Sequence, residues 1–246
     1  MSTSGTGSCQ KSSTAVKVAE DIVGCNDREV PETPRRSYAG QSAEERRRQR
    51  RARLLDTALD VLAANEWRTA TVDKLCATAG LNKRYFYESF DNLDAVAAAA
   101  VDDVAADLRA ATLAALAASA DEPVERQALA TAGAVVTTLL QDVRRAQVLL
   151  GGVVTSPALH QHRATVIRGL TSVLVAHARS VHGVALEKDP LAQVGPAFIV
   201  GGTADAILEY INGRVRVTAD ELAQGLATLW VIAGNGAAEV ARTRNR

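Results

Sequence analysis

Two short helical patterns joined by a glycine turn constrain this chain more than any other feature of its sequence. The first pattern, "TVDKLCATA" (residues 71–79), begins at Thr71 and places apolar residues on one helical face. Gly80 follows, and glycine is the residue that most easily ends a helix in the left-handed conformation. Asn82 then precedes a second pattern, "KRYFYESF" (residues 83–90). A helix, a short turn containing glycine and a second helix together indicate a helix-turn-helix unit.

The second of these helices concentrates the chain's aromatic residues. Two of the four tyrosines and two of the three phenylalanines lie in "LNKRYFYESF" (residues 81–90), although aromatic residues make up only 4% of the chain. Phe86 and Phe90 are four positions apart and share one face, so we expect them in the core. Lys83 and Tyr87 share a different face and can present their polar groups outward. The pattern fits a recognition helix facing DNA, or else a small core with a solvated basic rim.

A net charge of zero conceals a positive segment that contains this unit. Residues 35–93 carry twelve basic and eight acidic side chains, whereas the segments on either side each carry an excess of acidic ones. Such a block indicates an anionic partner, although a charge run is often only a solvated face. "RRRQRRAR" (residues 46–53) precedes the helix-turn-helix pattern. It can act as a basic arm along DNA or be the solvated start of a helix.

The rest of the chain favours helices throughout. Alanine and leucine are abundant, and both are strong helix formers. Capping-box spacings occur at Ser42 with Glu45 and at Thr218 with Glu221. We therefore expect an all-α protein of about nine helices, the first three short and the other six mostly longer. The predicted parts are a disordered polar tail at 1–40, a helix-turn-helix DNA-binding domain at 41–92 and a larger helical domain at 93–246.

Several function classes lack support in the sequence. The three cysteines show no C-x-x-C spacing and two of them lie in the polar tail, which argues against a disulfide framework and for a reducing compartment. The four histidines fall between residues 160 and 182 without a spacing that suits a metal. No phosphate-binding, dinucleotide-binding or hydrolase motif occurs. We expect no catalytic residue, no metal and no cofactor.

The sequence also favours a cytoplasmic location. The polar N-terminal stretch has no apolar segment of the signal-peptide type. No apolar run is judged to reach the roughly 18 residues that a membrane-spanning helix needs. We therefore expect no membrane partner.

The stretch from Arg53 to Val96 resembles the DNA-binding domain of the TetR family of bacterial transcriptional regulators. The resemblance rests on "LLDTALDVLAANEW", "ATVDKLCATAGL" and "NKRYFYESFDNLDAV", with Tyr87 and Phe90 forming the family's Tyr-x-x-Phe. It implies a helix-turn-helix domain followed by a helical ligand-binding and dimerisation domain. It further implies a homodimeric repressor that binds an inverted-repeat DNA operator and is released by a small effector.

The resemblance also assigns roles to individual residues. Thr71 and Tyr87 match positions that contact phosphate, and Asn82, Lys83 and Tyr85 match positions that face bases or the groove. Where the family commonly has a lysine three residues after the phenylalanine, this chain has Leu93, so Arg84 or upstream arginines would replace that contact. The predicted DNA-binding residues are Thr71, Asn82, Lys83, Arg84, Tyr85, Tyr87, Arg48 and Arg51.

The last helical pattern, "TADELAQGLATLWVIAGNGAAEVA" (residues 218–241), is apolar most of the way round. Such a helix is buried on two sides, so one side can meet a second subunit; a thick monomeric core is the alternative. The predicted dimer interface comprises Leu222, Leu226, Leu229, Trp230 and Ala233.

A mostly apolar space between long helices would suit a hydrophobic or amphipathic effector, whose contact residues the sequence does not identify. Two other functions stay open at this point. One is an all-helical interaction protein that does not bind DNA. The other is a constitutive DNA-binding regulator without a small-molecule effector.

Overall fold

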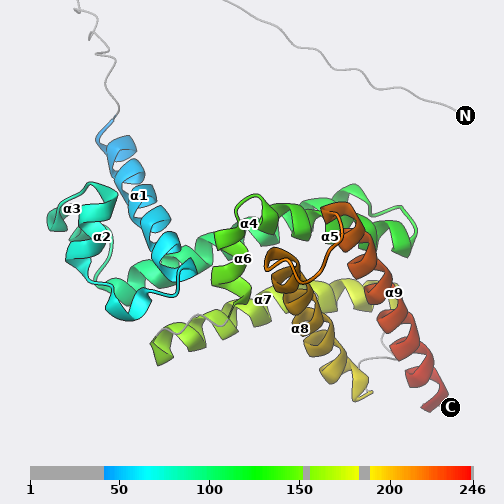
Figure 1. The fold of residues 1–246 in the computed structure, drawn as a ribbon. Coiled ribbons are helices and arrows are strands. Elements are labelled where there is room, and N and C mark those ends of the chain that lie inside the picture. The colour runs from blue at the N-terminus through cyan, green and yellow to red at the C-terminus, as the bar shows by residue number, and fades with distance from the viewer. Residues whose placement is uncertain (1–41, 152–155, 183–188, 245–246) are drawn as a thin grey trace, which may run out of the picture. The chain divides into compact units, whose positions relative to one another are not determined.

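The computed structural model describes residues 42–151, 156–182 and 189–244, and the tail predicted at 1–40 lies outside them. The described residues form nine α-helices, one short 3-10 helix and no strand, which confirms the predicted all-α class (Figure 1). The elements are α1 (Ala43–Ala63), η1 (Trp67–Thr69), α2 (Val72–Ala79), α3 (Lys83–Tyr87), α4 (Leu93–Ala118), α5 (Val124–Leu140), α6 (Val143–Leu150), α7 (Pro157–His182), α8 (Leu191–Ile211) and α9 (Ala219–Arg244).

Helix α1 contains the arginine-rich segment and begins at the capping-box position that the sequence predicted. The hydroxyl of Ser42 accepts a hydrogen bond from the backbone N–H of Glu45 at 3.0 Å and so caps the helix. From there α1 runs for 21 residues, which corrects the prediction of three short helices at the start. The segment 46–53 is therefore the first part of a helix and not an extended arm.

Local signals build the helix-turn-helix unit as predicted. Thr71 caps α2 by accepting from the N–H of Lys74 at 3.2 Å, and Asn82 caps α3 by accepting from the N–H of Tyr85 at 3.2 Å. Gly80 lies between them in the left-handed region, with φ of 65°. The N–H of Leu81 bonds back to the carbonyl of Cys76 at 2.9 Å, which closes the end of α2.

Gly80→Ala is expected to lower the free energy of unfolding by about 1 kcal/mol, because an L residue strains at positive φ. Nothing lies within 4 Å of an added Cβ at Gly80, so backbone strain alone causes the loss. Gly133, inside α5, is the matched control: its Cβ position is also open, but its φ is not positive. Gly133→Ala should raise stability by roughly 0.5–1 kcal/mol in urea denaturation. Equal effects of the two substitutions would contradict the assignment of strain to Gly80.

One hydrophobic core runs through both predicted domains. Around the helix-turn-helix unit it contains fully buried side chains from α1, α2, α3 and α4, among them Leu54, Leu75, Phe86 and Val96. It continues into the layer where α5 packs against α4 and α9. Helix α4 contributes to both regions and therefore holds the helix-turn-helix unit on the remaining helices.

The two ends of α6 are held by arginines. At its start, Arg144 bonds Asp142 at 2.6 Å and, on α1, Asp60 at 2.5 Å and Asp56 at 3.0 Å. Hydrogen bonds from Arg144 hold the pKa of Asp142 below its usual value. This stabilisation is present above the unfolded-state pKa of the aspartate and is lost as pH falls through the lowered folded-state pKa.

The far end of α6 is fixed by α7. The half-buried Arg163 donates to the backbone carbonyls of Leu149 and Gly151, and burial lowers the pKa of its guanidinium. Carbonyl groups at the end of a helix lack hydrogen-bond donors within the helix, and the guanidinium of Arg163 provides the missing donors. Helix α6 thus links α1, in the helix-turn-helix part, to α7.

Helix α8 corrects the expectation that no segment is long and apolar enough to span a membrane. Among the described residues, this one helix is long and apolar enough to span a membrane, by length and composition alone. Little of it is buried within the chain. Its exposed apolar side chains include Val194 and Phe198, and α9 beside it exposes Leu229 and Ile232. We call these four residues, together with Val240 of α9, the α8–α9 apolar face.

Candidate nucleic-acid interface and ligand cavity

Helix α3 separates its packing residues from its outward ones. Phe86 is fully buried and Phe90 nearly so, as predicted. Lys83 is exposed, the side chain of Arg84 is 83% exposed and Tyr87 is 58% exposed. The ring of Tyr87 meets Phe86 edge-on, with ring centroids 5.3 Å apart, and more than half of the tyrosine is left exposed. This short helix therefore presents two cations and a phenol from a rigid apolar base.

The basic start of α1 lies against α3. The guanidinium of Arg50 is 4.3 Å from the ring centre of Tyr85, and that of Arg51 is 5.0 Å from the ring centre of Phe90. Arg47 donates to the backbone carbonyl of Glu88, just past the end of α3, at 3.0 Å. The aromatic rings thereby hold arginines of α1 beside α3.

Three of the predicted contact residues have local roles as well. The side-chain oxygens of Thr71 and Asn82 are used by their helix caps, which leaves the exposed amide of Asn82 with further hydrogen-bonding capacity. Arg48 bonds Glu45 on the same helix at 2.5 Å. Thr71 and Asn82 directly precede α2 and α3, and the bond between Lys83 and Asp73 joins the first turns of these two helices. Arg48, by contrast, lies on the first turns of α1.

Intramolecular carboxylates hold two cations of this surface. Lys83 bonds Asp73 of α2 at 2.7 Å, and this hydrogen bond raises the pKa of the lysine. Arg84 bonds Glu88, four residues later at the end of α3, at 3.2 Å. Both pairs are exposed, so they are weak and exchangeable for another anion. A phosphate or a base edge can replace Asp73 at Lys83.

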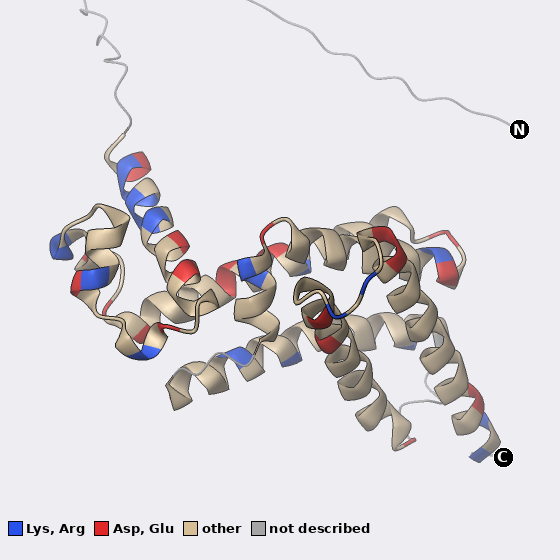
Figure 2. Cartoon of the chain, in the orientation of Figure 1, with Lys and Arg blue, Asp and Glu red and all other residues tan. Residues whose placement is uncertain are grey.

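The positive side chains gather at one end of α1 and on α3. Figure 2 shows Lys and Arg on the early turns of α1 and on α3, and acidic residues in the first turn and on the later turns of α1. Arg47 and Arg50 belong to this basic group but were not among the predicted contacts. Their spacing of three on one helix face is the signal that could have singled them out.

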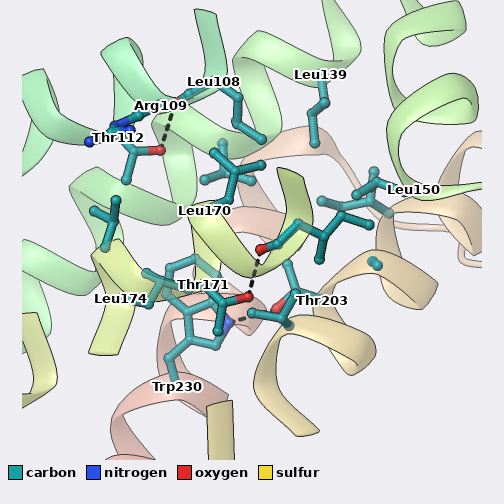
Figure 3. A pocket seen from close by; sticks show the side chains of 16 residues that line it. Leu108, Arg109, Thr112, Leu139, Leu150, Leu170, Thr171, Leu174, Thr203 and Trp230 are labelled. Carbon is teal, nitrogen blue, oxygen red and sulfur yellow. Dashed lines mark hydrogen bonds between the residues drawn. The ribbon is translucent and has the colours of Figure 1, made fainter. Parts of the chain in front are cut away.

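An apolar cavity lies among α4, α5, α7, α8 and α9 (Figure 3). Its volume is about 80 Å³, and a single water needs roughly 10–15 Å³ on the same measure. Leucine, isoleucine and valine side chains form most of its wall, including Leu108, Leu139, Leu150 and Leu170. Since Leu150 is the last residue of α6, the cavity touches the helix that bonds to α1.

The polar groups of the cavity are few. Thr112 and Thr171 donate to backbone carbonyls four residues earlier, at 2.7 and 2.8 Å. Trp230 donates its indole N–H to the hydroxyl of Thr203 at 2.8 Å. Arg109 is the one charged residue among the described residues of the wall, and it is exposed. The cavity therefore suits an apolar molecule.

The predicted dimer-interface residues point in different directions. Leu222 and Leu226 are buried in the chain's own core, so the structure corrects their placement on an outer face. Trp230 lines the cavity, and Ala233 is half-buried beside a groove between α7, α8 and α9. Leu229 alone of the five is largely exposed. It belongs to the α8–α9 apolar face, whose other members, Val194, Phe198, Ile232 and Val240, were not among the predicted interface residues.

Other chemistry finds little support in the described part of the chain. No group of three or more His, Cys, Asp or Glu side chains there could hold a metal ion. Cys76 is buried, and burial raises the pKa of its thiol, as for an inert core residue.

Comparisons with known proteins identify the fold. No protein-family model matches the sequence, and no curated protein matches it significantly. Among solved structures, the fatty acid degradation regulator FadR from Bacillus halodurans is similar with a TM-score of 0.62 and 16% identity, over 76% of this chain and 95% of that one. FadR from Bacillus subtilis, solved with stearoyl-CoA, gives 0.60 and 15%, over 74% and 98%. A TetR-family transcriptional regulator from Streptomyces coelicolor gives 0.56 and 17%, over 80% and 89%.

Proposed function

We propose that this chain, which has the fold of the TetR-family transcriptional regulators, is itself a DNA-binding transcriptional repressor. The observation that carries the proposal is the α3 surface, where Lys83, Arg84 and Tyr87 project from a buried phenylalanine base beside arginines of α1. A helix that projects such groups can enter the major groove, reading base edges with some residues and fixing its register on phosphates with others. The protein would act in the cytoplasm, where its DNA lies.

The repressor is a homodimer joined through the α8–α9 apolar face. Phe198 is 73% exposed, Ile232 is 62% exposed, and both line one groove together with Val194 and Val240. An exposed apolar surface of this kind is a usual mark of an interaction site. Covering α8 with a second copy also accounts for a helix that is apolar yet hardly buried within one chain. A two-fold dimer carries two recognition helices and binds an inverted repeat.

The operator is released when a small apolar effector fills the cavity. The similar FadR from Bacillus subtilis was solved in complex with stearoyl-CoA, which supports a small-molecule ligand for this chain as well. A ligand that enlarges the cavity would press on Leu150 at the end of α6, and α6 is bonded to α1 through Arg144. A constitutive regulator would bind the operator but would not be released by an effector. An all-helical interaction protein would not bind the operator at all.

Selection of bound fragments from genomic DNA tests the proposal. We expect enriched fragments that share an inverted repeat, with affinity that falls steeply as salt concentration rises. Recovered sites without two-fold symmetry would contradict the dimeric mode of binding. Failure to enrich any fragment would support the interaction-protein alternative.

Tyr87→Phe and Lys83→Ala should separate phosphate contact from base reading. Loss of the Tyr87 hydroxyl should weaken binding to operator and random DNA alike, because phosphate carries no base identity. If Lys83 reads a guanine, its loss should cost roughly 1–3 kcal/mol on the operator and less on random DNA. Salt titrations on both DNAs measure this, with circular dichroism as the folding control. Wild-type affinity in both folded variants would mean that this face is only a solvated rim.

A further inference from the structure

We propose that the Thr203–Trp230 pair is the polar recognition element of the cavity, and that its ligand is an uncharged apolar molecule with one hydrogen-bond acceptor. A ketone, an ester or a lactone has this chemistry. The inference rests on the proposed ligand role of the cavity and goes further by naming the class of molecule and the group that selects it.

The wall of the cavity excludes a buried charge. Among its described residues no Asp, Glu, Lys or His occurs, and the guanidinium of Arg109 belongs to an exposed residue on α4. A carboxylate or ammonium inside would lose its hydration without gaining a partner, which costs far more than apolar contacts return. The part of the ligand that enters the cavity is therefore neutral.

The hydroxyl groups of the wall differ in what they have left to offer. Thr112 donates its hydrogen to the carbonyl of Leu108, and Thr171 donates to that of Ile167. Neither has a hydrogen left for a ligand. Thr203 accepts the indole N–H of Trp230 but donates to no group in the described structure. Its hydrogen is the uncommitted hydroxyl donor of this wall.

The position of Thr203 suits such a role. Figure 3 shows its hydroxyl beside the Trp230 nitrogen at the cavity, with Thr171 nearby. The bond from Trp230 occupies one side of the oxygen and polarises the hydroxyl, which strengthens its donation to a second partner. An apolar ligand with a carbonyl can complete this chain of hydrogen bonds, whereas a pure hydrocarbon leaves the donor unused.

The pair also joins the two helices of the proposed dimer. Thr203 lies on α8 and Trp230 on α9, and the outward sides of these helices carry the α8–α9 apolar face. A ligand held at Thr203 therefore contacts the helix pair that the second subunit would cover.

Calorimetric titration of the full-length protein with acetophenone, ethylbenzene and benzoate tests the inference. The three probes are similar in size and differ in having a neutral acceptor, no acceptor or a charge. Wild type should bind acetophenone most tightly. Thr203→Val should lose roughly 3- to 10-fold in affinity for acetophenone, the effect of one net hydrogen bond, and should bind ethylbenzene unchanged. Thr203→Ser, which keeps the hydroxyl, should keep the preference.

Thr112→Val is the matched control, because its hydroxyl lines the same cavity but is already committed to Leu108. This variant should retain the preference for acetophenone. Equal binding of acetophenone and ethylbenzene by wild type, tightest binding of benzoate, or no binding of any probe would each overturn the proposal. An equal loss of acetophenone affinity in Thr112→Val and Thr203→Val would overturn it as well.

Operator binding, measured in parallel without probe, keeps this inference separate from the proposed function. Selective acetophenone binding by a protein with no DNA affinity would remove the repressor function but leave the recognition element standing. Tight operator binding without probe selectivity would leave the repressor function standing and would remove the recognition element.

Discussion

Phe86→Ala is expected to destabilise the helix-turn-helix part by about 3–5 kcal/mol, a large share of the total stability of a domain. Phe86 is fully buried and meets Phe90 at a ring-centre distance of 5.9 Å, so its removal leaves a cavity between α3 and the helices beneath. DNA binding should be lost because the recognition helix is no longer held. Urea denaturation followed by circular dichroism measures the change.

Tyr87→Ala is the natural control for this substitution. The two residues are neighbours on α3, yet Tyr87 projects to solvent, so its removal should change stability by less than about 0.5 kcal/mol. DNA affinity should fall in both variants, but in Tyr87→Ala without unfolding. A Phe86→Ala protein as stable as wild type would show that α3 is not anchored as described.

Phe198→Asp combined with Ile232→Asp is expected to give a monomer. Each charge would lie on the α8–α9 apolar face and, in a symmetric dimer, near its own copy, where an unpaired charge is costly to bury. Operator affinity should fall on the order of 100-fold or more, since a monomer holds one recognition helix and loses the gain from two linked contacts. Light scattering after gel filtration measures the mass, and a titration measures the affinity.

Val143→Asp serves as the control, because this exposed valine lies on α6 and outside the α8–α9 apolar face. It should leave the mass and the operator affinity unchanged. A double variant that stays dimeric would move the interface elsewhere on the chain. A wild-type protein that is already monomeric would remove the dimer from the proposal.

Signals within a few residues of one another were enough to predict the helix-turn-helix unit. Thr71, Gly80 and Asn82 each act on backbone groups at most five positions away, so their effects can be read from the sequence. The division of Phe86 from Tyr87 also follows from helical periodicity alone. These local rules are consistent with the tertiary packing, and the predicted helix-turn-helix unit is confirmed.

The α8–α9 apolar face could not be predicted in the same way. Helix α9 is apolar on most of its circumference, so periodicity does not distinguish Leu222, which packs inside, from Leu229, which faces outward. The placement of Arg50 over Tyr85 likewise depends on how α1 crosses α3, a long-range contact without a local signal. The start of α1, by contrast, was predicted from the local capping-box spacing of Ser42 and Glu45.

The uneven distribution of charge along α1 has a consequence for how the proposed repressor would approach DNA. Six arginines lie within residues 46–53 and outnumber Glu44 and Glu45 in the first turn, whereas Asp56 and Asp60 lie in the later turns, where they bond Arg144. In the field of a polyanion this imbalance produces a torque that turns the arginine-rich turns of α1 toward the polyanion and the later turns away from it. Most collisions would then begin in an orientation close to the productive one. Lowering the salt concentration should therefore speed association, over and above any slower dissociation.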